Sequence, residues 1–420
     1  MKNRVVKMLA VATAAVACLG VMAGAEDSIR LVNGKIEIDA QLKKLAEMYE
    51  GETGVHVEIE SMGGGIDIQG TIKGYYQSDN MPDIFVNNGT DFLNWEGLLV
   101  DMSDQAWAAD TDAAYKNADG LVGFPYTTEA IGLAYNCDVL EKAGVDPATL
   151  TSPAAYADAF AAIDGMKEEL GLTAVVGYCA EVQNLYWSTG NHLFANYLDA
   201  GLDRADTTYI DMLSDGGQLE PERLTKFAEF VGLLQQYSDP ELLVSGTYDQ
   251  QILNFASGKY AFVTQGSWIG ATMTSNDAAE YEAAGSFKCA MAPYAFEDGI
   301  DTILTEAPSY WSVYKDGNVE AAEAFLQWLT TEPAQEVLVG EAGFVSPFKS
   351  CTVVAADPFA QTISDYVAAG KTSSWHWSFM KEGLAQNATG QIFGMYAQGQ
   401  LDAAGFVDAL SSVIADYYAN

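Results

Sequence analysis

The chain has 420 residues, with 58 Asp or Glu against 20 Lys or Arg, and a formal net charge of −38. Such a negative field repels nucleic acid and anionic lipid, so both are excluded as partners. Because 49% of the residues are hydrophobic and 11% are aromatic, the chain can bury large cores, and its length predicts two domains.

The first 25 residues have the pattern of a secretory signal peptide. Three basic residues precede an uncharged run, residues 8–22, and Ala23-Gly24-Ala25 forms a small-residue cleavage site. We expect cleavage after Ala25 and export to the periplasm or the extracellular cell surface. A lipid anchor at Cys18 and a retained membrane anchor are the alternatives.

Strand and helix patterns then alternate. Residues 28–32, 54–59 and 81–86 predict strands, whereas residues 38–49 and 68–76 predict helices because their apolar positions recur at helical spacing. This order predicts an α/β fold with a mostly parallel sheet and helices on both faces. Ligands of such sheets bind beyond the carboxyl ends of the strands.

Three polar segments fall at this predicted edge, namely residues 63–65, 87–90 and 127–129. The glycines of the first are either a ligand-contacting loop or a plain tight turn, and they lack the Gly-Lys-Ser/Thr ending of a phosphate loop. The candidate ligand-binding residues in these segments are Gly64, Asn87, Asn88, Thr90, Thr128 and Glu129.

The stretch from Gly123 to Asn136 joins a proline-marked turn to a short apolar strand, Ile131–Tyr135. We expect the next helix to begin near Asp138, a good N-cap residue. Glu129 lies at the mouth of that strand, where binding sites on α/β scaffolds tend to occur. We expect its carboxylate to accept hydrogen bonds from ligand hydroxyls.

Arginine is scarce beyond the signal peptide, where only Arg30, Arg204 and Arg223 occur. The planar guanidinium is the usual partner of carboxylates and phosphates, and none of the three falls in a predicted binding segment. The ligand is therefore predicted to be neutral, with a cation as the second choice.

Cysteine and histidine indicate neither a metal nor a cofactor. Cys137, Cys179, Cys289 and Cys351 fit no zinc spacing, and the three histidines are scattered. Disulfides and buried free thiols both stay open for the four cysteines.

Several segments, in order along the chain, resemble the extracellular solute-binding proteins of ABC sugar importers (family 1, maltose-binding-protein-like). The matching segments are 49–55, 82–85, 123–136, 255–268, 321–335 and 343–347. The resemblance implies a type II periplasmic-binding-protein fold, in which two α/β lobes, each a mostly parallel sheet flanked by helices, are joined by a hinge. It predicts an N-terminal lobe of residues 28–134 and 290–345, and a C-terminal lobe of residues 135–289 and 346–420.

The resemblance also implies a function. The protein would capture a neutral mono- or oligosaccharide between the lobes and deliver it to a membrane permease, as a monomer and without enzymatic activity. Two departures bear on the ligand: Asn87 and Asn88 stand where the maltose-binding type has a Trp, and Cys137 replaces a common Lys. The resemblance therefore does not predict that an aromatic ring of the N-terminal lobe stacks on the sugar.

Aromatic residues supply the remaining candidates, because a ring covers the apolar face of a sugar while polar side chains hold its hydroxyls. Each ring could equally be part of a core, and Trp311 at a strand end is ambiguous in this respect. The candidates are Tyr186 with Asn191, Gln265 with Trp268, Trp311, Trp375 and Trp377.

Two other functions remain as alternatives. A receptor for a polyamine or another cationic solute fits the acidity and the scarce arginine, and needs several carboxylates converging in the cleft. A secreted glycoside hydrolase needs two carboxylates flanking the scissile bond. Because the chain has 58 acidic residues, the presence of such a pair says little about this function.

Overall fold

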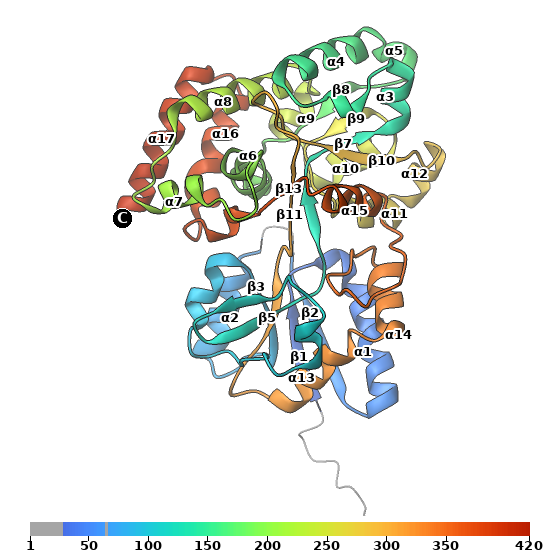
Figure 1. Ribbon diagram of the computed structural model, residues 1–420, viewed down its shortest axis with the longest axis vertical. Coiled ribbons are helices and arrows are strands. Elements are labelled where there is room, and N and C mark those ends of the chain that lie inside the picture. The colour runs from blue at the N-terminus through green and yellow to red at the C-terminus, as the bar shows by residue number, and fades with distance from the viewer. Residues whose placement is uncertain (1–27, 64–65) are drawn as a thin grey trace, which may run out of the picture.

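A computed structural model describes residues 28–63 and 66–420. The predicted signal peptide, Cys18 and Gly64 therefore lie outside the described residues. The chain forms two lobes, one above the other in Figure 1, which we call the N-lobe (below) and the C-lobe (above). Each lobe is built on its own sheet, and a small third sheet lies at their junction.

The N-lobe sheet has six strands in the order β2-β1-β3-β12-β5-β4. Its strands are β1 (Ser28–Asn33), β2 (His56–Ser61), β3 (Ile84–Asn87), β4 (Tyr115–Asn117), β5 (Gly120–Pro125) and β12 (Tyr310–Val313). The helices of this lobe are η1 (Ile36–Ile38), α1 (Asp39–Thr53), α2 (Ile68–Gln77), η2 (Gly89–Trp95), η3 (Ala106–Ala109), α13 (Val319–Trp328), α14 (Glu332–Gln335) and η6 (Glu336–Glu341).

The C-lobe sheet has four strands in the order β10-β7-β9-β8, which are β7 (Leu133–Asn136), β8 (Ala174–Gly177), β9 (Tyr260–Val263) and β10 (Cys289–Ala292). Its helices as far as residue 245 are α3 (Cys137–Ala143), η4 (Pro147–Thr149), α4 (Pro153–Gly165), α5 (Lys167–Leu170), η5 (Ser188–Leu193), α6 (Phe194–Asp199), α7 (Thr208–Ser214), α8 (Pro221–Gln236) and α9 (Pro240–Ser245). The later ones are α10 (Tyr248–Ala256), α11 (Ile269–Thr274), α12 (Ala278–Ala283), α15 (Ala360–Ala368), η7 (His376–Phe379), η8 (Ala385–Thr389), α16 (Gly390–Ala397) and α17 (Ala403–Ala419).

The predicted elements of the first 90 residues are confirmed, and so is the α/β class. β1 pairs in parallel with both β2 and β3, as the alternation of strands and helices predicts. β12 instead runs antiparallel to β3 and β5, because this strand enters the N-lobe sheet as the chain returns from the C-lobe.

The strand predicted at Ile131–Tyr135 is two strands. β6 (Glu129–Ile131) pairs with β11 (Ile303–Glu306) at the junction, which in turn pairs with β13 (Thr372–Ser373), whereas β7 joins the C-lobe sheet. Gly132 separates β6 from β7, and a Cβ there would approach the Met291 Cβ to 3.0 Å. The N-cap of α3 is Asn136 rather than Asp138, because the Asn136 Oδ1 accepts the N–H groups of residues 138 and 139.

The predicted lobe boundaries remain predictions. β7 and β10, which contain the boundaries drawn at residues 134 and 290, pair with each other inside the C-lobe sheet. Phe348 packs in the N-lobe core, whereas Phe359 packs in the C-lobe. We therefore propose that the chain changes lobe at β6, at β11 and between residues 348 and 359.

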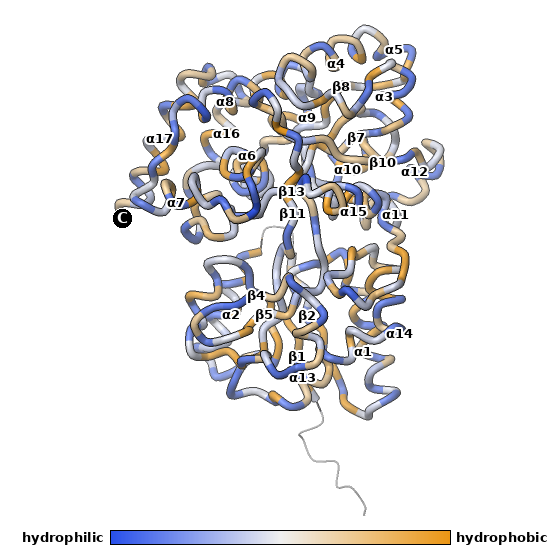
Figure 2. Tube along the Cα trace, viewed as in Figure 1, coloured by the Kyte–Doolittle hydropathy of each residue, from blue (hydrophilic) through white to orange (hydrophobic). Residues whose placement is uncertain are grey.

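Each lobe has its own set of buried residues. The helical part of the C-lobe wraps around α6, which mixes orange and blue residues in Figure 2 and has all six of its residues buried. The N-lobe sheet is covered by apolar clusters on both faces, one of them centred on Trp311 and Phe325. No helix within residues 28–63 and 66–420 is long and apolar enough to cross a bilayer.

Candidate functional site

The carboxyl ends of three parallel N-lobe strands lie side by side and end in polar residues. Asn33 at the end of β1 pairs in register with Ser61 at the end of β2, and β3 ends at Asn87. The Asn33 Oδ1 and the Asn87 Nδ2 are buried and have no hydrogen-bond partner among the described residues. Because an unpaired buried polar atom costs about 1–3 kcal/mol, a polar ligand at this edge would be stabilised.

Lys35 follows β1 and places a cation at the same edge. Its Nζ donates to Glu129 Oε1 and lies 3.4 Å from Glu37 Oε1, and the Lys35 and Glu129 side chains are only 12% and 8% exposed. Burial by itself would lower the pKa of Lys35, but the two carboxylates raise it above its ordinary value. The lysine is therefore protonated, and it offsets the charge of both acids.

The prediction that Glu129 is a free acceptor for a ligand is wrong in this structure. Its carboxylate is buried in an ion pair with Lys35, a residue 94 positions earlier in the chain. The error has a physical cause: Glu129 is on β6 and Lys35 follows β1, and only the assembled N-lobe brings these two segments together.

Four tryptophan rings of the C-lobe gather around His192. The centroid of its ring lies 4.7 Å from that of Trp268, 4.9 Å from Trp377, 5.3 Å from Trp187 and 5.8 Å from Trp375. These residues come from three segments far apart in the sequence. We call this set (Trp187, His192, Trp268, Trp375 and Trp377) the aromatic cluster.

Four of the five rings carry a buried nitrogen that has no hydrogen-bond partner within residues 28–63 and 66–420: the Nε1 atoms of Trp268, Trp375 and Trp377, and the Nδ1 atom of His192. Burial, with a smaller effect of Lys35, lowers the pKa of His192 to about 3, so its imidazole is neutral. Apolar ring faces beside unpartnered polar atoms suit an uncharged molecule that has both C–H faces and hydroxyls.

The aromatic cluster faces the charged edge of the N-lobe. Lys35 of the N-lobe contributes to the lowered pKa of His192. Burial raises the pKa of Tyr248, and Glu37 and Glu129 of the N-lobe add to this effect. The Tyr248 ring lies 5.7 Å from that of Trp187. A small cavity of about 20 Å³ is lined from both sides, by residues that include Glu37, Thr128, Glu129, Ser267 and Trp268. The two lobes therefore border one cleft.

Trp268 is positioned by the loop before α11. Ser267 exchanges two hydrogen bonds with Ala130 of β6, at 2.9 and 3.0 Å, which ties this loop to the junction. A Cβ on Gly266 would lie 2.0 Å from the Trp268 ring. Gly266 is therefore needed for the indole to fold back over the backbone, rather than for a ligand to approach it.

Trp375 and Trp377 flank His376, which Asp199 at the end of α6 holds in place. The His376 N–H donates to Asp199 Oδ2 at 3.0 Å, and the His376 Nδ1 lies 2.6 Å from Asp199 Oδ1. Burial by itself would lower the pKa of His376, but the Asp199 carboxylate raises the pKa above its ordinary value. This double contact fixes the backbone between the two tryptophans.

His192 belongs to a π-helix, η5, which also contains Asn191. Single π-helical turns inside α-helices occur frequently at functional sites. Tyr186 lies just before η5 and is half-buried, and Asp67 of the N-lobe adds to the effect of burial in raising its pKa. The predicted residue Tyr186 thus borders the same cleft, and Asn191 stays a prediction.

Gln265 is part of a buried polar chain beneath the aromatic cluster. Its Nε2 donates to Ser188 Oγ at 3.0 Å and to Gln251 Oε1 at 2.9 Å, while Gln251 donates to the carbonyl of Gly177. The Gln265 Oε1 has no hydrogen-bond partner in the part of the chain that the structure describes, so it is an available acceptor there.

Three predicted N-lobe residues are engaged in structural contacts. Asn88 forms a capping box with Asp91 at the start of η2. Thr90 donates its Oγ1 to the carbonyl of Met380 at 3.1 Å, and the Thr128 N–H donates to the Val345 carbonyl at 2.8 Å. These contacts hold Asn88 and Thr90 at the edge of the cleft, whereas Thr128 lines the small cavity beside Trp268.

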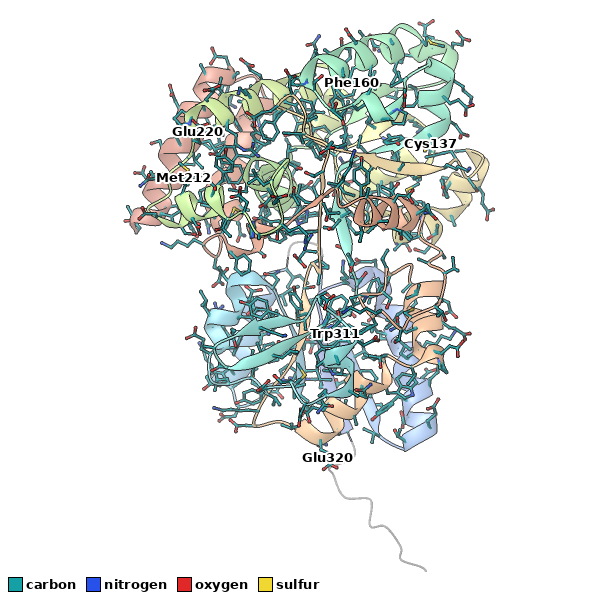
Figure 3. The ribbon with its side chains drawn as sticks, viewed as in Figure 1. Cys137, Phe160, Met212, Glu220, Trp311 and Glu320 are labelled. Atoms are coloured by element: carbon teal, nitrogen blue, oxygen red, sulfur yellow. The ribbon has the colours of Figure 1, made fainter. Side chains whose placement is uncertain are left out.

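The prediction that Trp311 binds the ligand is wrong. Its side chain is fully buried in the middle of the N-lobe (Figure 3), where its ring stacks on Tyr126 with centroids 4.2 Å apart. β12 is a central strand, and Trp311 lies on the face that α1 and α13 cover, so a ligand cannot reach it.

The sequence-based selection missed four residues of the cleft: Lys35, Trp187, His192 and Tyr248. Trp187 and His192 are each adjacent to a selected residue, so their neighbours supplied a usable signal. Lys35 and Tyr248 carry no local signal, because their position in the cleft depends on the packing of the two lobes.

Within the described residues, the four cysteines are free thiols, and no group of three His, Cys, Asp or Glu residues is arranged to hold a metal ion. Cys179 and Cys289 are buried, and burial raises the pKa of both thiols. These residues therefore behave as small apolar side chains.

A family model described as bacterial extracellular solute-binding protein matches residues 44–368. The melibiose/raffinose/stachyose-binding protein MelE of Bacillus subtilis (strain 168) is 25% identical over 247 residues, which are 54% of this chain and 53% of MelE. The match thus spans about half the length of that relative.

Two solved structures show the same fold. A chitin oligosaccharide binding protein, 16% identical, has a TM-score of 0.75 over 94% of this chain and 99% of its own. A sugar transporter from Bacillus licheniformis in complex with stachyose, 15% identical, has a TM-score of 0.70 over 93% of this chain and 99% of its own. The two-lobe α/β fold expected from the sequence is confirmed.

Proposed function

Because this chain belongs to the bacterial extracellular solute-binding proteins, we propose that it captures an uncharged mono- or oligosaccharide in the cleft between its lobes. The observation that carries the proposal is the aromatic cluster, which combines apolar ring faces with four buried nitrogens that lack hydrogen-bond partners among the residues described. Sugars present C–H faces and hydroxyl edges, which these two features match.

Within this proposal, Trp268, Trp375, Trp377 and Trp187 contact the sugar rings, and His192, Gln265 and Asn87 hold the hydroxyls. Tyr186 and Asn191 border the cleft and take further sugar units. Asn88 and Thr90 act at its edges through the backbone contacts described above, and Thr128 acts beside Trp268. Gly64 stays a predicted contact outside the described residues.

The names of the relatives support a sugar ligand. MelE is named for melibiose, raffinose and stachyose, and the two structural neighbours are named for chitin oligosaccharide and for a complex with stachyose. We extend this to a role as the monomeric binding component of an ABC transporter that passes its sugar to a membrane permease without breaking a bond. Export with cleavage after Ala25 belongs to the same proposal.

The cleft charges disfavour the cationic alternative. A polyamine receptor needs carboxylates that are free to face the ligand, whereas Glu129 and Glu37 both lie against Lys35. The cation already present offsets their charge, and a second cation would have to displace it.

A thermal-shift titration with a panel of sugars tests the function. The panel contains melibiose, raffinose, stachyose, chito-oligosaccharides and monosaccharides, with spermidine for comparison. A ligand that binds the native state alone adds about 2.7 kcal/mol of stability at 100 times its Kd, so at least one sugar should raise the Tm. A rise with spermidine and with no sugar contradicts the proposal, as does cleavage of a bound oligosaccharide detected by chromatography.

Trp268→Ala tests whether this residue contacts the sugar, and Trp328→Ala is the matched control. Both tryptophans are half-buried, but Trp328 lies in the N-lobe on α13, with its Nε1 donating to Glu52. We expect both variants to lose stability and only Trp268→Ala to lose sugar affinity, by roughly tenfold or more, since a ring contact contributes beyond its buried area. Equal affinities in the two variants would remove Trp268 from the site.

A further inference from the structure

The two lobes touch at a point separate from the junction strands and the aromatic cluster. Gly89, the first residue of η2 in the N-lobe, lies against the backbone of Ser378 in η7 of the C-lobe. A Cβ placed on Gly89 would be 1.5 Å from the Ser378 carbonyl oxygen. Only glycine allows the two backbones to approach so closely.

Polar contacts surround this point. Thr90 Oγ1 donates to the carbonyl of Met380 at 3.1 Å. Lys73 of α2 donates to the two carboxylate oxygens of Glu382 at 3.0 and 3.3 Å, and Asn94 donates to Glu382 at 3.3 Å. All of these bonds join an N-lobe side chain to the segment 378–382 of the C-lobe.

That C-lobe segment continues directly from two rings of the aromatic cluster. Trp375 and Trp377 precede Ser378, and Asp199 clamps the backbone between them through its two contacts with His376. Residues 375–382 therefore carry ring contacts at one end and the contacts with the N-lobe at the other. The same short backbone segment therefore joins the aromatic cluster to the contact at Gly89.

We propose that Gly89 and the Lys73–Glu382 pair form a latch that holds the lobes closed, and that these are positioning residues that set affinity without touching the ligand. The latch completes only when η2 and η7 meet, so it stabilises the closed arrangement relative to the open one. A ligand that contacts both lobes gains affinity from any interaction that favours closure. The effect on affinity rests on the proposed function, whereas the effect on lobe closure does not.

Gly89→Ala tests the latch, with Gly74→Ala as its control. A Cβ at Gly74, in α2 of the same lobe, meets nothing within 4 Å. We expect Gly89→Ala to increase the radius of gyration of the ligand-free protein in small-angle X-ray scattering and to weaken sugar binding at least about tenfold, mainly through faster dissociation. Gly74→Ala should change neither quantity.

A second pair of variants is needed because Gly89 has a φ of 33°, at which alanine is strained whatever its surroundings. Lys73→Glu and Glu382→Lys each reverse one charge, and the double variant restores an opposite pair. Since the two side chains are 37% and 46% exposed, each single reversal should weaken binding about two- to fivefold, and the double variant should recover it.

The outcomes separate the latch from the sugar proposal. An expanded Gly89→Ala protein supports the latch even if no sugar in the panel binds. If Gly89→Ala lowers the Tm while leaving the radius of gyration unchanged, the residue has a structural role only and the latch is overturned. If the charge reversals do not change sugar affinity, or if the double variant fails to recover it, the Lys73–Glu382 pair is not part of the latch.

Discussion

Buried charge at the cleft is the main feature at the scale of single residues. Lys35, Glu37 and Glu129 form a compact group in which one cation meets two carboxylates, next to rings that suit a neutral ligand. Removing one member of a buried pair strands the other, which costs more than the pair contributes when intact. We therefore assign Glu129 to the stability of the cleft wall first and to the ligand second.

Lys35→Met tests this assignment. The variant leaves Glu129 and Glu37 without their cation, so the free energy of unfolding should fall by about 3–5 kcal/mol. Urea denaturation at neutral pH measures the change. Glu129→Gln should also destabilise the protein, and the double variant should recover part of the loss because neither partner is then stranded.

The control for this prediction is Lys43→Met. Lys43 pairs with Asp39 at 2.7 Å on the surface of α1, where its side chain is 59% exposed, so the substitution should change stability little. If Lys35→Met is as stable as Lys43→Met, the Lys35 pair is not a structural ion pair, and Glu129 returns as a candidate acceptor for the ligand.

At the scale of elements, a carboxyl group lies in an unusual position just before α15. Asp357 accepts the N–H of Phe359 at 2.7 Å, and a Cβ on Gly270 of α11 would collide with its carboxyl group. Burial, with a smaller effect of Glu129, raises the pKa of Asp357 to about 8. The close approach of α11, which only glycine permits, therefore encloses an acid that holds its proton at neutral pH.

Asp357→Asn tests this arrangement through the pH dependence of stability. The folded-state pKa lies above the unfolded one, so the folded chain retains a proton that the unfolded chain releases, and stability falls as pH rises from about 4 to about 8. Asparagine keeps the acceptor and does not titrate. As the pH rises across this range, the free energy of unfolding of Asp357→Asn should increase relative to that of the wild type by about 1 kcal/mol or less per pH unit.

Denaturation at pH 5, 6.5 and 8 measures the difference, and Asp101→Asn, whose carboxyl group titrates below this range, is the control that should differ from the wild type by a constant amount. Hydrogen bonds from Ser103 and Leu121 lower the pKa of Asp101, so its contribution to stability is present at neutral pH and is lost on acidification. A constant difference between wild type and Asp357→Asn across the three pH values would show that Asp357 is ionised in the folded protein.

At the scale of the whole molecule, the net charge of −38 acts against compactness, whereas the ligand that we propose for the cleft is neutral. Repulsion among like charges destabilises the folded chain and is screened by salt, since the Debye length shortens from about 30 Å at 0.01 M to about 3 Å at 1 M. Folding and ligand binding should therefore respond to salt differently.

Raising NaCl from about 0.02 M to about 0.5 M should increase the Tm, because screening relieves repulsion in the folded state. The Kd for a neutral sugar should stay within about twofold over the same range, since neither member of the complex gains or loses a long-range attraction. A Kd that weakens more than about tenfold would identify a cationic ligand and contradict the sugar proposal.

The sequence was sufficient for features that depend on neighbouring residues. Apolar spacing predicts α1 and α2, and the alternation of elements predicts the parallel pairing of β1 with β2 and β3. The resemblance of several ordered segments correctly predicts the family and the two-lobe fold. Trp268, Trp375 and Trp377 were also selected from the sequence, and the structure brings these rings into one cluster.

Tertiary structure alone decided which of the selected residues can reach a ligand. Trp311 and Trp268 look alike in the sequence, yet the first is sealed beneath α1 and α13 and the second faces the cleft. Lys35 meets Glu129 across 94 residues, and Asp199 meets His376 across 177. Local patterns record which side of an element is apolar, whereas contacts between distant segments arise only when complete sheets and lobes pack against each other.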